Sequence, residues 1–183
     1  MAQTALLIID VQASFLHRPY WSEENLSPFK QALAALIEGC RRQGALLADI
    51  FHDDGEWPFN LASGLVTRLP FLTHTADVTV YKHVHNALTE SGLHPWLQER
   101  QVNHLIIAGL RTEQCCETTA RVASDLGYRV TFVTEATLTF PMSHAGRTVS
   151  SDELKFHTET VLKDRFAAIR DVSGCLAELA ADR

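Results

Sequence analysis

An α/β fold with a parallel sheet is predicted by three features of this 183-residue chain. Short apolar runs of strand length recur along it, and stretches with helical periodicity separate them. The apolar runs lack polar–apolar alternation, which is typical of strands buried on both faces. No repeat or flexible linker interrupts the pattern. We therefore predict one domain, residues 1–183, with three α/β/α layers and a mostly parallel, Rossmann-like sheet of about six strands.

The first half of the chain begins with an apolar strand at 5–9, which ends at Asp10. A helix is expected over 23–43, where apolar residues recur every three or four positions and Gly44 ends the run. A second strand follows at 45–51. Residues 52–75 contain two Pro and two Gly in a polar context, so we expect a long, partly helical excursion there.

The second half is expected to continue the alternation of strands and helices. The predicted strands are 78–81, 104–108, 129–134 and 167–170. The predicted helices are 89–101, 115–126, 151–163 and a short one after 173. Gly127 closes the helix that starts at Cys115, and Ser151-Asp-Glu is a typical helix opening.

Composition narrows the class of protein. A formal charge of −6 without a basic run argues against nucleic acid as a partner. No apolar stretch approaches the ~20 residues of a membrane helix, and the N-terminus lacks the features of a signal peptide. We expect a cytoplasmic protein with reduced thiols. Cys40 and Cys175 are then expected to be small core residues rather than disulfide partners.

Three reactive side chains are expected at one edge of the sheet. Asp10, Lys82 and the turn from Gly109 to Cys115 follow the first, third and fourth strands. Ligands of such sheets bind outside the carboxyl ends of the strands. Taken singly, each residue also has an ordinary role: the Asp as a turn cap, the Lys as a solvated strand end and the Cys as a helix residue.

Together these residues predict hydrolysis of an amide, imide or ester through a thioester. A thiol in the first turn of a helix faces unpaired N–H groups, which favour its thiolate and can hold an oxyanion. Asp10 can take the thiol proton and return it to a leaving amine, while Lys82 stabilises the thiolate. Cys116 points about 100° away around the helix, and we expect it to face the sheet.

The chain resembles the isochorismatase-like cysteine hydrolase superfamily, which includes nicotinamidases and N-carbamoylsarcosine amidohydrolase-like enzymes. The resemblance is carried by the following blocks: Leu6–Gln12 (LLIIDVQ), Tyr81-Lys82 before Asn86-Ala-Leu88, Ala108–Arg121 (AGLRTEQCCETTAR), Asp125–Tyr128 and Val133–Ala136. It implies an Asp-Lys-Cys triad, here Asp10, Lys82 and Cys115. It also implies a cis peptide at Leu110–Arg111, with the N–H groups of Arg111 and Cys115 as the oxyanion hole, and assembly as a homo-oligomer.

The chain departs from the nicotinamidase pattern at the metal site of those enzymes. Their Asp-x-His pair after the second strand is absent, because Asp49 and His52 stand three residues apart. His83 and His85 have ligand-like spacing, but no third ligand is evident. We therefore expect neither a metal nor another cofactor, and a small molecule as the substrate.

Substrate contacts are expected from residues near the predicted rim. The candidates are Phe15, His52, Asn86, Arg111 and Phe140. Arg111 can bind a substrate carboxylate or point outward to a subunit contact. The preferred function is cleavage of a C–N bond in a small amide, ureide or carbamoyl compound. The alternatives are vinyl ether hydrolysis of the isochorismatase type, a nicotinamidase-like amidase, and a scaffold without activity.

Overall fold

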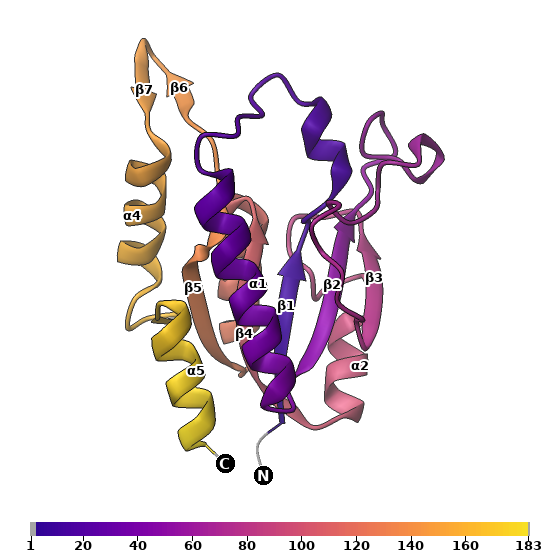
Figure 1. The fold of residues 1–183 in the computed structure, drawn as a ribbon, viewed down its shortest axis with the longest axis vertical. Coiled ribbons are helices and arrows are strands. Elements are labelled where there is room, and N and C mark those ends of the chain that lie inside the picture. Colours follow the sequence, from indigo (N-terminus) through magenta and orange to yellow (C-terminus); the bar gives the residue numbers. More distant parts are fainter. Residues whose placement is uncertain (1–2, 183) are drawn as a thin grey trace.

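The fold is a parallel six-stranded sheet between two layers of helices, seen in a computed structural model that describes residues 3–182 (Figure 1). The strand order is β3-β2-β1-β4-β5-β8, and every neighbouring pair is parallel. The strands are β1 (Gln3–Ile9), β2 (Leu46–His52), β3 (Val78–Lys82), β4 (Val102–Leu110), β5 (Arg129–Leu138) and β8 (Ala168–Ile169). The predicted fold class is confirmed.

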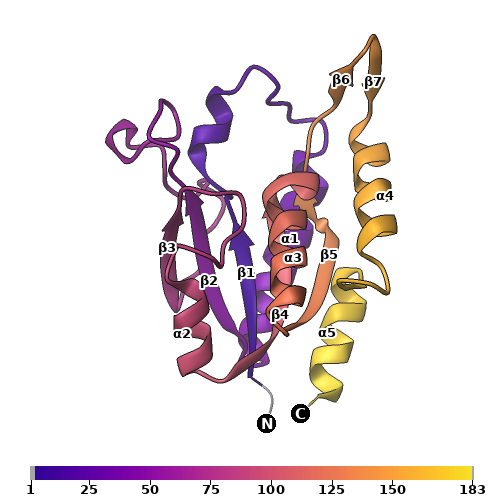
Figure 2. The same ribbon diagram turned by 180° about the vertical axis from the view of Figure 1, so that it is seen from behind.

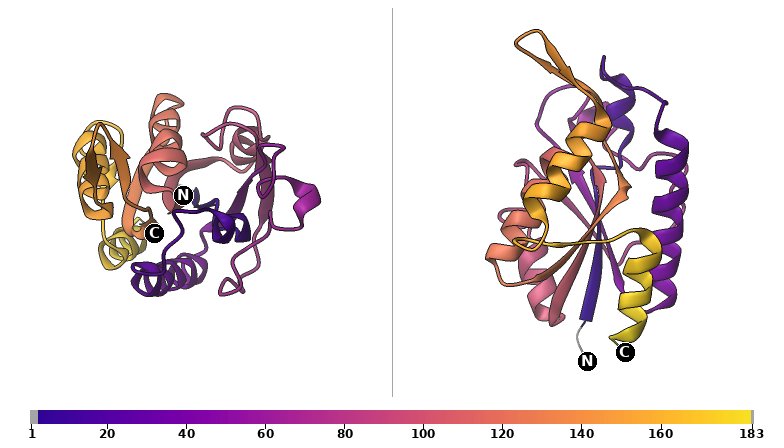
Figure 3. Two further views of the ribbon diagram at one scale, coloured as in Figure 1. Left: turned by 90° about the horizontal axis from the view of Figure 1, so that it is seen from above. Right: turned by 90° about the vertical axis from the view of Figure 1, so that its left-hand side faces the viewer.

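Helices cover both faces of the sheet, which explains why its central strands are largely apolar and buried (Figure 3, right). One face carries α1 (Leu26–Arg42) and α5 (Val172–Ala181). The other carries α2 (Leu93–Glu99), α3 (Glu117–Asp125) and α4 (Ser151–Leu162) (Figure 2). Alternate residues of β1 enter the two cores, so Leu6 and Ile8 pack toward α1 whereas Leu7 and Ile9 pack on the opposite side.

Several boundaries differ from those predicted. Helix α2 begins at Leu93 rather than Thr89, because Gly92 adopts a left-handed φ of 81° immediately before it. The Asn86 side chain caps the N–H groups of Leu88 and Thr89 in the preceding loop. Strand β5 continues to Leu138 beyond a register shift in its pairing with β4. The expected excursion contains one short helix, η2 (Leu61–Ser63).

A hairpin that the sequence did not predict extends from the carboxyl edge of the sheet (Figure 1). It consists of β6 (Met142–His144) and β7 (Arg147–Val149), which pair antiparallel. Ala145 and Gly146 form its turn with φ values of 50° and 77°, the signs that a two-residue hairpin turn requires. The strands are too short and too polar to give a periodic signal.

The strand order places the reversal of the chain path at β1 and β4. From β1 the chain winds outward to β2 and β3, and then returns to β4 on the other side of β1. Crevices at such reversal points, outside the carboxyl ends of the strands, are where these sheets bind ligands. Within residues 3–182, no helix has the length and apolarity to cross a membrane.

Candidate active site

Asp10 stands immediately after β1 in a backbone conformation that few residues adopt. Its φ is +52°, in the left-handed region, where Asp is tolerated better than most residues. Its N–H donates to the carbonyl of Ile50 at 2.8 Å, so the turn remains tied to β2. The side chain is only 1% exposed. The turn thus directs a buried carboxylate to the carboxyl edge of the sheet, and strained backbone of this kind is common at functional sites.

Lys82 is the last residue of β3, two strands away from β1. At ~4.8 Å between strands, only a long side chain can cross from there to Asp10. The Lys82 Nζ lies 3.0 Å from the Asp10 carboxylate and 3.3 Å from the Cys115 Sγ, and it donates to the carbonyl of Val84 at 3.1 Å. The side chain is buried completely. Burial would lower the pKa of Lys82, but Asp10 and Cys115 outweigh it and raise this pKa, so the group is an ammonium ion.

Cys115 lies in η3 (Thr112–Cys116), a π-helical turn between β4 and α3. The residue is 8% exposed, and its thiol faces Asp10 and Lys82. The expectation of a lowered thiol pKa is wrong for the free protein. Burial raises the pKa of Cys115 well above its ordinary value, the Asp10 charge raises it further, and Lys82 opposes both. The resting group is therefore a neutral thiol beside a carboxylate.

Cys116 has a different environment, although it is adjacent in sequence. It is completely buried and belongs to the apolar core beneath α2 and α3. Burial raises the pKa of this thiol as well. The expected inward orientation of Cys116 is confirmed, and Cys40 and Cys175 are likewise buried as free thiols.

His52 ends β2 between Asp10 and Lys82, and Gln12 fixes its backbone. The Gln12 Oε1 accepts from the His52 N–H at 2.8 Å, and the Gln12 Nε2 donates to the His52 carbonyl at 3.0 Å. The His52 ring is 2.9 Å from the Lys82 Nζ through its Nδ1. Burial lowers the pKa of His52 and Lys82 lowers it further, so the ring is neutral and its Nδ1 accepts from the ammonium.

Gly109 and the Leu110–Arg111 peptide lead into the cysteine turn. Gly109 has a φ of +123°, and a Cβ there would lie 2.0 Å from the carbonyl oxygen of Ile9. Only glycine allows β4 to approach β1 this closely. The Leu110–Arg111 peptide bond is cis. The close approach at Gly109 brings the turn that carries Cys115 against the end of β1.

The Arg111 side chain neither enters the cavity at Cys115 nor points outward, so both expectations for it are wrong. It is 6% exposed and donates to the carbonyl of Phe140 at 3.2 Å. Its guanidinium lies 3.3 Å from the Glu113 carboxylate and 4.6 Å from the centre of the Tyr20 ring. Arg111 therefore supports the Tyr20 ring from behind.

A cavity of about 130 Å³ opens at the reactive residues. It is lined by Asp10, Phe15, Arg18, Tyr20, His52, Asp54, Phe59, His85, Gln114 and Cys115. Of the predicted substrate contacts, Phe15 and His52 belong to this lining. Asn86 and Phe140 do not: Asn86 caps its own loop, and the Phe140 ring packs behind Tyr20 and Trp21.

The sequence did not single out Arg18, Tyr20, Asp54 or Gln114. Arg18 follows the short helix η1 (Ala13–His17), and Asp54 lies in the loop after β2. Neither loop has periodicity or a motif that would have assigned these residues to the site. His85 was noted for its ligand-like spacing from His83, and the structure brings it to the cavity together with Phe59.

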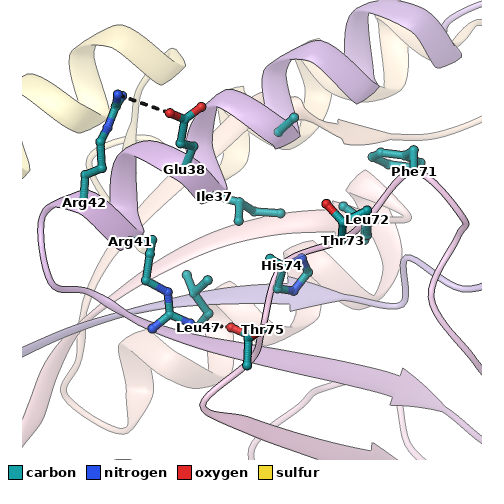
Figure 4. A pocket seen from close by; sticks show the side chains of 11 residues that line it. Ile37, Glu38, Arg41, Arg42, Leu47, Phe71, Leu72, Thr73, His74 and Thr75 are labelled. Carbon is teal, nitrogen blue, oxygen red and sulfur yellow. Dashed lines mark hydrogen bonds and ion pairs between the residues drawn. The ribbon is translucent and has the colours of Figure 1, made fainter.

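A larger cavity of about 550 Å³ lies between α1 and the loop before β3 (Figure 4). Its charged groups have partners: Arg42 pairs with Glu38, and Arg41 with Asp77 and the carbonyl of Thr75. It contains none of the three candidate catalytic residues. The cavity at Cys115 is therefore the candidate active site.

Asp49, whose spacing from His52 departs from the nicotinamidase metal pair, belongs to an ion-pair network. The Asp49 carboxylate is buried and pairs with Arg68 at 2.5 Å and His74 at 2.8 Å. It lies three residues before His52 on β2 and does not line the cavity. In the part of the chain that the structure describes, no three His, Cys, Asp or Glu side chains gather as a metal-binding group. These residues do not fit such a metal.

Comparison with known proteins assigns the family. The isochorismatase domain model matches residues 4–162. The YrdC protein of Bacillus subtilis, described as an uncharacterized isochorismatase family protein, is 26% identical over 171 residues and covers 90% of each chain. Nicotinamidase 3 of Arabidopsis thaliana is 29% identical over 152 residues, which are 74% of this chain and 73% of the relative.

A solved structure agrees with this assignment. A putative isochorismatase-family hydrolase from Chromobacterium violaceum superposes with a TM-score of 0.87 at 26% identity, over 98% of this chain and 94% of the other. The family model covers most of the chain, and the superposition extends over nearly all of it. The chain belongs to the isochorismatase family of hydrolases.

Proposed function

We propose that this protein is a cysteine-dependent hydrolase that cleaves the C–N bond of a small amide, ureide or carbamoyl substrate through a thioester. One observation carries the proposal: a single buried ammonium, Lys82, contacts both the Asp10 carboxylate and the Cys115 thiol. Nucleophile and base therefore meet in a nearly dry site, where charge interactions are stronger than in water.

The reaction begins with proton transfer from the Cys115 Sγ to Asp10 as the sulfur attacks the substrate carbonyl carbon. The carbonyl π electrons move to oxygen, and the N–H groups of Arg111 and Cys115 stabilise the oxyanion in this proposal. Collapse of the adduct breaks the C–N bond, and Asp10 gives its proton to the departing nitrogen. Ammonia or an amine leaves, and the acyl group remains on sulfur.

Water completes the cycle. Asp10 takes a proton from water as the water oxygen attacks the thioester, and the C–S bond then breaks. Asp10 returns its proton to the departing thiolate and the acid product leaves, so one water is consumed per C–N bond. Lys82 remains an ammonium ion throughout and stabilises the transient thiolate.

The raised thiol pKa suits this sequence of steps. A resting thiolate would carry a buried negative charge beside Asp10, and burial together with Asp10 disfavours that state. Transfer of the proton during attack avoids it. Neutral His52 accepts a hydrogen bond from Lys82 without adding charge, so it holds the ammonium between the other two groups.

The cavity favours a small substrate. Its volume of about 130 Å³ is below the roughly 300–1,000 Å³ typical of sites for drug-sized ligands. The edge-to-face pair Phe15 and Phe59, with ring centres 4.9 Å apart, forms one wall. An aromatic wall also suits a pyridine ring, so a nicotinamidase-like amidase is the second candidate. Vinyl ether hydrolysis requires Asp10 as an acid and leaves the thiol without a role, and the Lys82 contact disfavours it.

Hydrolysis of a panel of small amides, ureides, carbamoyl compounds and nicotinamide tests the proposal, with ammonia release as the readout. We expect activity with the wild type, none with Cys115→Ala, and near-normal activity with Cys116→Val. Rapid acid quenching should reveal an acyl group on Cys115 by mass spectrometry. Hydrolysis that persists in Cys115→Ala would exclude the thioester route.

A further inference from the structure

Arg18 provides a cationic group in the lining of the active-site cavity. It follows η1, and its N–H donates to the Phe15 carbonyl at 3.0 Å, which fixes where its side chain begins. The guanidinium lies over the Phe59 ring, 4.7 Å from the ring centre. The stacked ring holds the guanidinium plane, a common arrangement for arginines that recognise planar anions. The cavity thus joins a reacting thiol to a positioned guanidinium.

The donors of this guanidinium have no hydrogen-bond acceptor within the described residues. Its nearest carboxylate, Asp54, is 3.9 Å away, beyond hydrogen-bond distance. The two side chains are 36% and 35% exposed, and pairs of this kind are weak in water. Arg111, by contrast, has its guanidinium engaged by Glu113 and the Phe140 carbonyl. Arg18 is therefore the arginine of this region that is free to bind a ligand.

Asp54 already serves the loop that carries it. Its Oδ1 accepts from the Glu56 N–H at 2.9 Å, and its own N–H donates to the Phe59 carbonyl at 2.9 Å. These bonds hold the segment that presents Phe59 to Arg18. At the reacting end, the Asp10 charge is already compensated by Lys82. Arg18 thus remains the cation that a substrate anion would meet.

We propose that Arg18 binds a carboxylate of the substrate, and that the preferred substrates are small amides, ureides or carbamoyl compounds with a carboxylate opposite the scissile bond. This inference rests on the proposed function. A carboxylate can accept two parallel hydrogen bonds from the guanidinium, and Asp54, at 3.9 Å, makes neither of them. The small cavity keeps the two ends of the substrate only a few bonds apart. Arg18 is a specificity residue and takes no part in the bond changes.

Two primary amides of equal size, the anionic succinamate and the neutral succinamide, test the charge preference together with the smaller, cationic 3-aminopropanamide. We expect the wild type to favour succinamate over succinamide at least tenfold in kcat/KM, with 3-aminopropanamide the poorest. Arg18→Gln should lose at least tenfold with succinamate, mainly through KM, and less than twofold with succinamide. Arg18→Lys should show an intermediate loss of kcat/KM with succinamate, because lysine keeps the positive charge but cannot donate two parallel hydrogen bonds. Arg42→Gln, a matched exposed arginine on α1, should leave the ratio unchanged.

Calorimetric binding to the Cys115→Ala protein separates this inference from the proposed reaction. Succinamate should bind at least tenfold more tightly than succinamide, and Arg18→Gln in the same background should remove the difference. Equal binding of the two probes, or no binding of either, would overturn the role of Arg18. A preference for 3-aminopropanamide would do so as well and would assign recognition to Asp54. Arg18-dependent binding without hydrolysis of any panel compound would instead count against the proposed reaction alone.

Discussion

The Lys82 ammonium lies 3.0 Å from the Asp10 carboxylate, and neither side chain is more than 1% exposed. Removing only one partner of such a pair costs much folding stability, because the remaining charge stays buried without an opposite charge. The contact therefore serves the fold as well as the site, and variants at either position report on both.

Lys82→Met should lower the free energy of unfolding by about 3–5 kcal/mol, because it leaves the Asp10 carboxylate buried and unpaired. Asp10→Asn combined with Lys82→Met should be more stable than Lys82→Met alone, since the double variant buries no isolated charge. Urea unfolding of the two single variants and the double variant measures the coupling. Strictly additive effects would show that the two side chains do not interact as the structure indicates.

Cys115→Ser should reduce turnover roughly 10³-fold or more, because an unactivated hydroxyl is a much poorer nucleophile than sulfur. Cys116→Val should retain most of the activity, since Cys116 contacts only the apolar core. Steady-state kinetics with an active panel substrate makes the comparison. The reverse pattern would assign the nucleophile to Cys116.

Much of the candidate site could be predicted because its residues stand at strand ends. In a parallel sheet those ends share one edge, so Asp10, Lys82 and Cys115 had to lie near one another once the strands were recognised. The protonation state of Cys115 could not be predicted from the sequence in the same way. The helix position of Cys115 favours a thiolate, but the structure shows that burial and Asp10 outweigh that effect.

The cavity wall was harder to predict than its chemical centre. Phe15 and His52 were expected and lie there, whereas Arg111 and Phe140 stack behind the wall. Which side chain of a loop faces inward depends on backbone turns that leave no periodic signal. Arg18 shows this most clearly, since its place over Phe59 joins two loops that are far apart in sequence.

His104 should make stability depend on pH. It is buried between Thr4, Thr131 and Arg129, and burial followed by the Arg129 charge lowers its pKa from 6.5 to about 4. The unfolded chain binds this proton near pH 6.5 and the folded chain only near pH 4. Stability is therefore complete above pH 6.5 and falls as the pH drops toward 4, by up to ~3 kcal/mol from this group.

Chemical denaturation at several pH values checks this dependence against His104→Gln. Carboxylates also titrate over part of the range, so the difference between the two proteins isolates the histidine. The variant should lose less stability than the wild type between pH 6.5 and pH 4. Parallel curves for the two proteins would contradict the lowered pKa.

We expect a homo-oligomer with the loops around the cavity at its interface. Leu16, Trp57 and Leu61 are 44%, 62% and 56% exposed, and the Trp57 ring contacts His17 beside Leu16. Exposed apolar side chains that gather at a site rim are typical of contact surfaces. A stable contact would bury on the order of 1,600 Å².

Light scattering at micromolar concentration measures the assembly. Trp57→Ser with Leu61→Ser should shift it toward monomer, whereas Phe156→Ser on α4, where the side chain is 71% exposed, is the control from another surface. A monomeric wild type with full activity would show that these loops serve the cavity of a single chain.

The Gln12 side-chain amide allows β1 and β2 to separate at the carboxyl edge of the sheet. Beyond Ile9 the β1 backbone turns away, and His52 on β2 would be left with an unpaired N–H and carbonyl. The Gln12 side-chain amide supplies both missing partners. It makes the two hydrogen bonds to His52 that a peptide group of β1 would otherwise make. The two strands can therefore separate where the reactive groups must fit, without leaving a backbone polar group stranded in a dry interior. A completely buried residue outside the cavity lining thus makes room for the site.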